Sequence, residues 1–268
     1  MIGIFDSGLG GLTVTKEVLR LLPEYQILYL GDTARTPYGN RSQDLIYQFT
    51  QQAVDYLFKQ GCQLIIVACN TSSAEALRRL QQEWLPNHYP DRRILGVIRP
   101  VVEEAVKISR SGQIGVIGTR GTVNAGAYER EIKVLLPKAT VISFACPLLV
   151  PIVEEGWSKR PETKKILRYY LRPLKNRKID TLILGCTHYP ILYRSIKQIC
   201  GRRIKVINSA EIVALKLKDY LARHLEIERQ LEKNNQHRFL VTDSTEVFKK
   251  NAQQWLGQEI KLEKIVLE

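Results

Sequence analysis

The sequence predicts an α/β protein made of two similar domains, each with a mostly parallel sheet flanked by helices. Short apolar runs rich in β-branched residues alternate along the chain with amphipathic helical stretches. Strands that are apolar on both faces, each followed by a helix, are typical of parallel sheets covered on both sides. Two segments, 64–71 and 182–187, also share one plan: an apolar strand, a small residue, a cysteine and then a threonine. We interpret them as equivalent positions in two related domains.

Hydrophobic periodicity predicts the individual elements in chain order. The predicted strands cover residues 2–5, 27–30, 64–68, 94–98, 114–117, 140–144, 181–184 and 205–207, with a further pair near 238–242 and 261–266. The predicted helices cover residues 12–22, 43–59, 72–83, 100–109, 125–136, 164–174, 191–199 and 210–232.

Length and composition are compatible with two compact domains. The chain has 268 residues, of which 44% are hydrophobic, so a sizeable core can form in each half. No apolar run approaches the roughly 18 residues that a membrane span requires. Met1 is followed at once by a predicted strand, and not by the basic region and long apolar stretch of a signal peptide. We therefore expect a cytoplasmic protein that has no membrane contact.

The formal net charge of +13 raises the question of an anionic partner. The densest basic groups are Arg92-Arg93, 172–178 and 202–205, which do not form one block. No aromatic residues interleave them as a base-stacking platform would require, so a nucleic-acid partner is not expected. A non-catalytic role of the basic surface, such as binding DNA or a topoisomerase, stays open, and salt-sensitive DNA binding would support it.

The cysteine and histidine content argues against disulfides and metal sites. The five cysteines are odd in number, the chain is long, and it lacks a secretory signal, so a disulfide framework is not expected. The sequence has no CxxC pair, and its four histidines form no cluster with metal-ligand spacing, so we predict no metal. The cysteines are therefore either buried structural thiols or reactive ones.

Cys69 and Cys186 each lie just after a predicted strand, at the edge where parallel α/β sheets carry their chemistry. A helix N-terminus beside such a cysteine favours the thiolate, so we expect a lowered thiol pKa at both positions. Inversion at an α-carbon needs a base on one face and an acid on the other, and two cysteines can exchange these roles. Asp6 is expected to assist Cys69, because the first and third strands often flank each other, and His188 is expected to assist Cys186.

A substrate with carboxylates needs hydrogen-bond donors at the same sheet edge. The loop 7–11 follows the first strand and opens a helix, so its backbone N–H groups can bind an anion. The side-chain donors that we expect there are Asn70, Thr71, Thr119 and Thr187.

Six motifs, in this order and spread over nearly the whole chain, resemble the glutamate racemase family of the aspartate/glutamate racemase superfamily. The resemblance implies two α/β domains with the active site in the cleft between them, and no cofactor. It also implies interconversion of L-glutamate and D-glutamate, which supplies D-glutamate for peptidoglycan synthesis. A homodimer is compatible with it. The motifs are FDSGLGGLTV at 5–14, PYG at 37–39, ACNT at 68–71, GVI at 96–98, CPL at 146–148 leading to VEEG at 153–156, and LGCTHYP at 184–190.

The resemblance also implies roles for particular residues. Cys69 and Cys186 correspond to the family's two catalytic cysteines, and Asp6, Glu154 and His188 to its assisting catalytic residues. Glu155 is adjacent to Glu154, and the sequence leaves open which of the two faces the site. The predicted substrate-binding residues combine the positions implied by the resemblance with Thr119, which is expected as a side-chain donor. They are Asp6, Ser7, Pro37, Tyr38, Gly39, Asn70, Thr71, Thr119, Thr187 and His188.

The family's domain boundaries are expected near Ile98 and Asn208 of this chain. Residues 1–97 together with 208–268 then form the first domain, which carries Asp6 and Cys69. Residues 98–207 form the second domain.

Two other activities and one cofactor are alternatives to this interpretation. A dinucleotide-binding dehydrogenase would use Gly8, Gly10 and Asp32, but Thr13 stands where its fingerprint needs glycine, and Asp6 would repel a pyrophosphate. Racemisation of aspartate by a related two-cysteine enzyme is the alternative for the substrate, because only the depth of the pocket would differ. Pyridoxal phosphate is not expected, because nothing in the sequence marks a Schiff-base lysine.

Overall fold

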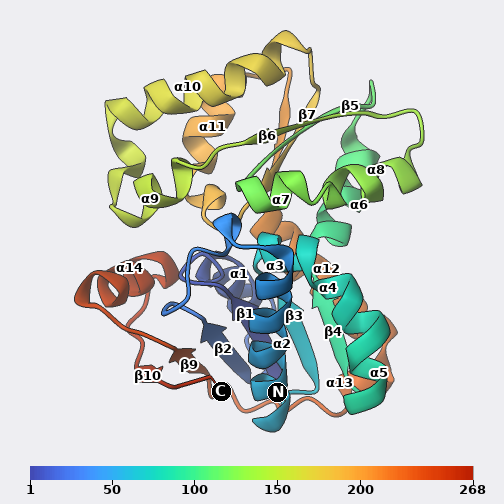
Figure 1. The fold of residues 1–268 in the computed structure, drawn as a ribbon, viewed down its shortest axis with the longest axis vertical. Coiled ribbons are helices and arrows are strands. Elements are labelled where there is room, and N and C mark those ends of the chain that lie inside the picture. The colour runs from blue at the N-terminus through green and yellow to red at the C-terminus, as the bar shows by residue number, and fades with distance from the viewer. Residues whose placement is uncertain (268) are drawn as a thin grey trace.

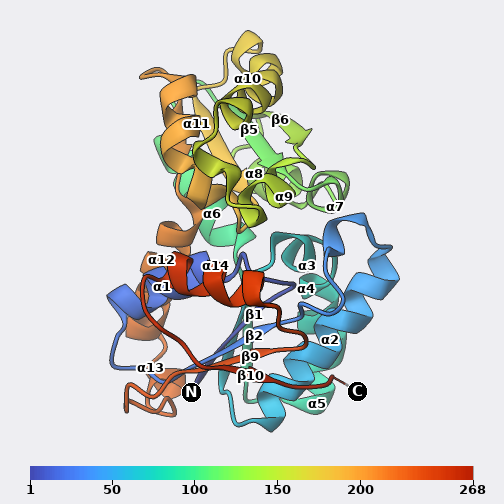
Figure 2. The ribbon, with the colours of Figure 1, turned by 90° about the vertical axis from the view of Figure 1, so that its left-hand side faces the viewer.

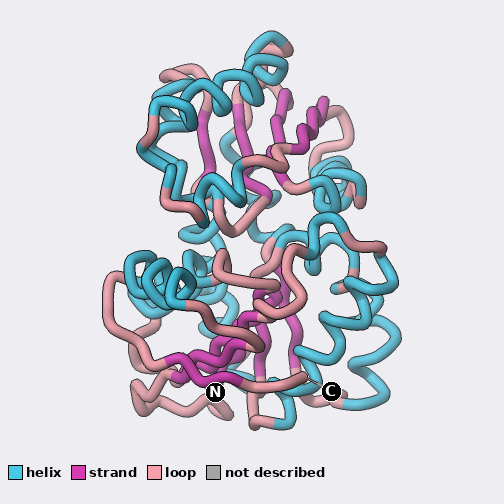
Figure 3. Tube along the Cα trace, turned by 60° about the vertical axis from the view of Figure 1, so that its left-hand side comes forward, coloured by secondary structure: helices cyan, strands magenta, loops and turns pink. Residues whose placement is uncertain are grey.

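The computed structural model describes residues 1–267 as two lobes, each built on its own sheet (Figure 1). A chain trace coloured by secondary structure shows the strands in two separate groups (Figure 3). The first sheet has the order β10-β9-β2-β1-β3-β4 and the second has the order β6-β5-β7-β8, with parallel pairing throughout. The strands are β1 (Ile2–Asp6), β2 (Ile27–Gly31), β3 (Leu64–Val67), β4 (Arg93–Gly96), β5 (Gln113–Gly118), β6 (Thr140–Ala145), β7 (Thr181–Gly185), β8 (Lys205–Ile207), β9 (Arg238–Val241) and β10 (Leu262–Lys264).

The two sheets repeat one arrangement. The order β2-β1-β3-β4 within the first sheet corresponds to the order β6-β5-β7-β8 of the second. The strands β3 and β7, which lead to Cys69 and Cys186, therefore occupy equivalent places in the two sheets. The predicted fold class, an α/β protein with two similar domains built on parallel sheets, is confirmed.

Helices cover both faces of the first sheet, as buried parallel strands require. Ile4 and Val18 belong to one cluster of buried side chains, so helix α1 covers one face, whereas Phe5 and Val54 belong to another cluster under α2. No helix within residues 1–267 is long and apolar enough to cross a membrane. The helices are α1 (Leu12–Leu21), η1 (Tyr38–Asn40), α2 (Gln43–Lys59), α3 (Asn70–Glu75), α4 (Leu77–Arg79), η2 (Leu80–Trp84), α5 (Leu85–His88), α6 (Ile98–Ile108), α7 (Arg120–Asn124), α8 (Ala127–Leu135), α9 (Leu149–Glu154), η3 (Trp157–Lys159), α10 (Pro161–Asn176), η4 (Tyr189–Leu192), α11 (Tyr193–Cys200), α12 (Ser209–Arg223), α13 (Leu225–Glu228) and α14 (Glu246–Leu256).

One apolar core runs through both lobes. The larger cluster of buried side chains contains Ile66 from β3, Val101 from α6, Ile183 from β7 and Leu217 from α12. Helix α12 packs on both α1 and α6, so it joins the lobes.

The predicted strands and long helices largely agree with the structure, but the short helices α5, α7 and α9 have no counterpart among the predicted elements, and several longer elements also differ. Residues 97 and 98 were predicted to end a strand, but Val97 caps helix α6, which begins at Ile98. The single helix predicted over 72–83 is broken into α3, α4 and the π-helical turn η2. The long helix predicted to reach residue 232 ends at Arg223 and is followed by the short helix α13.

Helix α14 was not predicted at all, although its end signals are present in the sequence. Thr245 caps its first turn by accepting from the backbone N–H of Phe248 (3.1 Å), and Gly257 follows its end in the left-handed conformation. Only a narrow apolar stripe, which includes Ala252 and Trp255, marks its buried face.

Asp180 connects the start of β7 to the turn that precedes β5. Its Oδ2 accepts hydrogen bonds from the backbone N–H groups of Arg110 (2.8 Å) and Ser111 (2.6 Å), and its Oδ1 accepts one from the hydroxyl of Ser109 (2.8 Å). Partial burial acts to raise the pKa of Asp180, but hydrogen bonds from Ser111, Ser109 and Thr181 outweigh it and lower the pKa to about 2.

We predict that Asp180→Asn lowers the free energy of unfolding at neutral pH by about 1–2 kcal/mol, because it removes hydrogen bonds to a charged group. The folded-state pKa lies below the ordinary aspartate value of 3.8, so the carboxylate stabilises the fold above that value. This contribution is lost as the pH falls through about 2. Urea unfolding of variant and wild type should therefore give a difference that shrinks below about pH 4. The exposed Asp91→Asn is the control, and a difference independent of pH would contradict the prediction.

Candidate active site

The C-terminal ends of the central strands bring the predicted residues of the two lobes together. In the first sheet, β1 ends at Asp6 and its neighbour β3 leads to Cys69. In the second sheet, β5 leads to Thr119 and its neighbour β7 leads to Cys186. The two edges meet where Thr187 Oγ1 donates a hydrogen bond to Asp6 Oδ1 (3.3 Å).

The loop after β1 packs so tightly against the loop after β7 that only glycine fits at position 10. A Cβ atom built on Gly10 would lie 2.1 Å from Thr187 Oγ1 and 2.5 Å from His188 Nδ1. At the start of α1, Thr13 Oγ1 donates to the carbonyl oxygen of Thr187 (2.8 Å). The absence of a side chain at Gly10 therefore sets the distance between the two strand ends.

Asp6 is a buried carboxylate at the centre of this contact. Its Oδ2 accepts from the backbone N–H of Gly8 (3.0 Å). Burial raises the pKa of Asp6, and this exceeds the opposing effects of the positive charge of His188 and of hydrogen bonds from Gly11, Gly8 and Thr187. The backbone N–H groups of Gly8 and Gly11, which were expected to bind a substrate carboxylate, are thus directed to Asp6.

Cys69 caps helix α3 and has hydroxyl and amide neighbours. Its Sγ donates to Ser7 Oγ (3.3 Å) and accepts from the backbone N–H of Ser72 (3.5 Å). Burial and the nearby Asp6 raise the pKa of the Cys69 thiol, and its hydrogen bonds with Ser7 and Ser72 oppose them. The expected lowering of this pKa by the helix N-terminus is therefore wrong for Cys69, because desolvation exceeds the effect of the helix end.

Cys186 stands beside an imidazole and carboxylate pair. His188 Nδ1 lies 3.8 Å from Cys186 Sγ, and its Nε2 donates to Glu154 Oε1 (2.8 Å). Burial acts to lower the pKa of His188, but its hydrogen bonds to Cys186 and Glu154 and their negative charges outweigh burial and raise the pKa to about 10. The structure directs Glu154 toward the site, whereas Glu155 is exposed.

Threonine hydroxyls from the two lobes also meet near Cys69. Thr71 Oγ1 lies 3.0 Å from Thr119 Oγ1 and 3.3 Å from Thr122 Oγ1. The Tyr128 hydroxyl donates to Asn70 Oδ1 (2.7 Å), so the oxygen of this amide is occupied and its nitrogen is the group that can donate to a substrate. The sequence does not single out Thr122 and Tyr128, because only the tertiary fold brings their helices α7 and α8 to this edge.

The segment 37–39 approaches the site through its main chain. Pro37 is exposed, and the buried Tyr38 directs its hydroxyl to Asp32. Gly39 packs on Thr119, so that a Cβ atom there would lie 2.8 Å from the Cβ of Thr119. Substrate contacts from residues 37–39 therefore remain a prediction. The part of this segment that approaches another predicted residue is the main chain of Gly39, which lies beside Thr119.

Asp32, the acid that a dinucleotide-binding enzyme would need, is occupied within the first lobe. Its carboxylate accepts from Arg35 Nε (2.6 Å), from Thr242 Oγ1 (2.9 Å) and from the hydroxyl of Tyr38. With these three partners in a fully buried position, Asp32 has no face left for a ribose.

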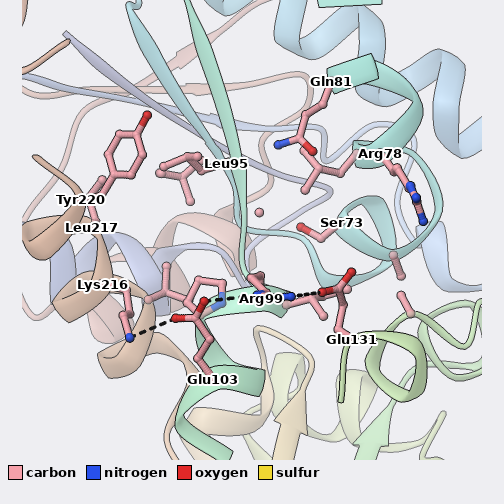
Figure 4. Close-up of a pocket in the computed structure, with 18 of the residues that line it drawn as sticks. Ser73, Arg78, Gln81, Leu95, Arg99, Glu103, Glu131, Lys216, Leu217 and Tyr220 are labelled. Atoms are coloured by element: carbon pink, nitrogen blue, oxygen red, sulfur yellow. Dashed lines mark hydrogen bonds and ion pairs between the residues drawn. The ribbon is translucent and has the colours of Figure 1, made fainter. Parts of the chain in front are cut away.

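A cavity of about 600 Å³ lies away from these groups, beside α4, α6, α8 and α12 (Figure 4). Arg99 pairs there with Glu131 (2.9 Å), and Lys216 pairs with Glu103 (3.1 Å). None of the predicted catalytic or substrate-binding residues lines this cavity. The chemistry of the strand ends, and not this cavity, locates the site. Within residues 1–267, no group of three or more His, Cys, Asp or Glu side chains is arranged to hold a metal ion.

Comparison with known proteins agrees with this geometry. Residues 2–217 match the Asp/Glu/Hydantoin racemase family. The chain belongs to this family. A glutamate racemase from Bacillus cereus is 42% identical over 259 residues, which cover 97% of this chain and 94% of the relative. The expectation that the chain is an amino-acid racemase is thereby confirmed.

Two solved structures extend the similarity to the whole fold of this racemase. The crystal structure of a glutamate racemase from Bacillus anthracis has a TM-score of 0.91 at 38% identity and covers 100% of this chain and 97% of its own. A glutamate racemase from Francisella tularensis, solved in complex with D-glutamate, has a TM-score of 0.88 at 34% identity with the same coverage.

We predict that Gly10→Ala lowers kcat/KM of the racemase about a hundredfold, because the added methyl group would push the loop of His188 away from Asp6. Steady-state kinetics measure the loss, and thermal unfolding shows whether the fold survives. Gly8→Ala is the matched control, since its Cβ would meet Thr36 Oγ1 at 3.3 Å and nothing closer. Equal effects of the two substitutions would contradict the role of Gly10 as the contact point.

We predict that Glu154→Gln lowers the pKa of His188, because it removes the negative charge that stabilises the imidazolium. The high-pH limb of the activity profile should move to lower pH, and NMR titration of the imidazole should give a value below about 10. Glu155→Gln is the control, because its side chain is exposed. An unchanged His188 titration in Glu154→Gln would rule out this electrostatic coupling.

Proposed function

We propose that this protein is a cofactor-independent glutamate racemase in which Cys69 and Cys186 act as the two bases on opposite faces of the α-carbon. The observation that carries the proposal is the placement of one buried cysteine at each of two meeting sheet edges, each with its own partners for proton transfer. The glutamate racemase names of the relatives support glutamate over aspartate as the substrate.

In each direction, one thiolate removes the α-proton, so that an S–H bond forms while the Cα–H bond breaks. The thiol of the other cysteine then delivers its proton to the opposite face of the carbanion, which leaves that sulfur as the thiolate. The two sulfurs have exchanged protonation states, and the reverse reaction or exchange with solvent restores them. Two like groups suit this reaction, because the base of one direction is the acid of the other.

The two thiols reach the thiolate form in different ways. Asp6 lies close to Cys69, and its raised pKa makes it a stronger base than an ordinary carboxylate. Cys186 has the imidazolium of His188 beside it, and Glu154 holds this imidazolium in its charged form. We assign Asp6, His188 and Glu154 these assisting roles.

We propose that neutral donors bind the two carboxylates of glutamate. Ser7, Asn70, Thr71, Thr119 and Thr187 gather around the cysteines from both lobes. The predicted substrate-binding set contains no lysine or arginine. Hydroxyl and amide donors hold carboxylates in place without stabilising the ground state so strongly that product release becomes slow.

The proposal also includes a domain division and a cellular role. Residues 1–97 with 208–268 would form one domain and residues 98–207 the other, which is supported by the placement of β4, β9 and β10 in the first sheet and of β5 to β8 in the second. The supply of D-glutamate for peptidoglycan synthesis rests on the family resemblance, as does the expectation of a homodimer.

The decisive experiment incubates purified protein with L-glutamate in D2O without added cofactor. We expect the circular dichroism of glutamate to decay while deuterium enters the α-position. Cys69→Ala and Cys186→Ala should each lower kcat by about 10²–10⁴-fold, because each removes one proton-transfer group. Cys200→Ala, in helix α11, is the matched control. Exchange with aspartate and none with glutamate would replace the proposed substrate, and unchanged activity of both cysteine variants would end the two-thiol mechanism.

A further inference from the structure

The C-terminal helix α14 reaches across from the first lobe to the His188 and Glu154 pair of the second. Figure 2 shows α14 on the side of the lower lobe that faces the upper one. The rings of Trp255 and His188 meet edge to face, with centroids 5.6 Å apart and planes at 87°. Asn251 Nδ2 donates to the main-chain carbonyl oxygen of Glu154 (2.7 Å). Both side chains are buried, with exposed fractions of 9% for Trp255 and 8% for Asn251.

Helix α14 is anchored in the first lobe. It follows β9 of the first sheet and packs on α1, where Lys16 Nζ donates to the carbonyl oxygen of Trp255 (3.0 Å). Ala252 and Leu256, which are fully or almost fully buried, belong to the larger core cluster. The positions of Asn251 and Trp255 are therefore set by the first lobe, although the groups that they contact belong to the second.

Asn251 contacts Glu154 at the C-terminal end of helix α9. Glu154 ends the six-residue helix α9, and the last carbonyl groups of a helix have no partner within it. Asn251 supplies one for the Glu154 carbonyl. Two residues further on, Gly156 takes a left-handed conformation, and the chain leaves toward η3. Asn251 therefore holds the main chain of Glu154 in addition to the hydrogen bonds that close α9 from Glu155 to Pro151 and from Gly156 to Val153.

The contact between Trp255 and His188 affects the orientation of the imidazole ring. His188 has to keep Nδ1 toward Cys186 and Nε2 toward Glu154 at the same time. The ionisable groups that face its ring are Cys186 beside it, Glu154 on α9 and Asp6 at the end of β1. The edge-to-face contact with Trp255 limits rotation of the imidazole away from this alignment.

We infer that Asn251 and Trp255 are positioning residues, through which the first lobe aligns the His188 and Glu154 pair for proton transfer at Cys186. This inference rests on the proposed function, because it gives the pair its task in racemisation. Its consequence is that the second base is fully competent only while α14 is docked, so the relative placement of the lobes controls Cys186 more directly than Cys69.

Two substitutions on α14 test the inference. Asn251→Leu keeps the size of the side chain but removes the donor, and Trp255→Leu removes the aromatic edge. We expect each to lower kcat about tenfold to hundredfold while KM changes little, because misalignment of a proton-transfer group affects the transition state most. Trp255→Phe should restore most of the activity. Gln254→Ala, on the exposed face of the same helix, is the matched control and should behave as wild type.

The readouts separate positioning from loss of the fold. The high-pH limb of kcat and the NMR titration of the His188 imidazole should both move to lower pH in Asn251→Leu, because a loosened Glu154 stabilises the imidazolium less. Rates of α-proton exchange measured separately from L-glutamate and from D-glutamate should fall unequally, because only one direction begins at Cys186. Should Asn251→Leu fail to fold, Asn251→Ser, which is too short to reach the carbonyl, replaces it.

The outcomes also distinguish this inference from the proposed function. Wild type without racemase activity would defeat the proposed function, while the His188 titration in wild type and Asn251→Leu would still measure the alignment. Folded variants at both positions that keep the wild-type kcat, pH profile and His188 titration would overturn the inference, even with the racemase activity intact. An equal loss in both directions with an unchanged His188 titration would also overturn it.

Discussion

The arrangement of the site depends on one close contact, between the loop after β1 and the loop after β7. Parallel strands present their carboxyl ends at a single edge, so each lobe gathers its reactive groups at one place. Those groups become a single site only because the two edges touch, with the main chain at Gly10 against Thr187 and His188. The hydrogen bond from Thr187 to Asp6 and the one from Thr13 to Thr187 keep this contact in register.

Burial at this contact places the two cysteines in different electrostatic surroundings. Around Cys69, burial and the carboxylate of Asp6 raise the pKa of the thiol against the opposing hydrogen bonds of Ser7 and Ser72, and Asp6 provides a base beside it. Around Cys186, an imidazole whose pKa is raised by its partners provides a positive charge instead. Two chemically identical sulfurs therefore have unlike partners. The symmetry of the repeated strand order does not extend to the acid-base groups, because Asp6 ends strand β1, whereas Glu154 ends helix α9 and His188 follows strand β7.

Local patterns in the sequence were sufficient for much of the fold and for part of the site. The apolar strands and their order of appearance follow from periodicity, and Cys69 and Cys186 stand out because each ends such a strand. The loop 7–11 shows the limit of this reasoning. The sequence indicates that its backbone N–H groups are free to bind an anion. It does not indicate which anion, and in the structure the N–H groups of Gly8 and Gly11 bind the buried carboxylate of Asp6. Helix α14 escaped prediction because its narrow apolar stripe resembles that of an ordinary surface segment.

The sequence by itself determined the class of fold, the family and the two strand-end cysteines that we propose as bases, because these depend on strand periodicity and on short contiguous motifs. Only the tertiary structure decided that Glu154 rather than Glu155 meets His188, that Asp32 is occupied by Tyr38, Arg35 and Thr242, and that α14 touches the second lobe's acid-base pair. The direction of a side chain at a helix end, and the partner of a buried polar group, follow from packing between segments distant in sequence. No local pattern encodes that packing.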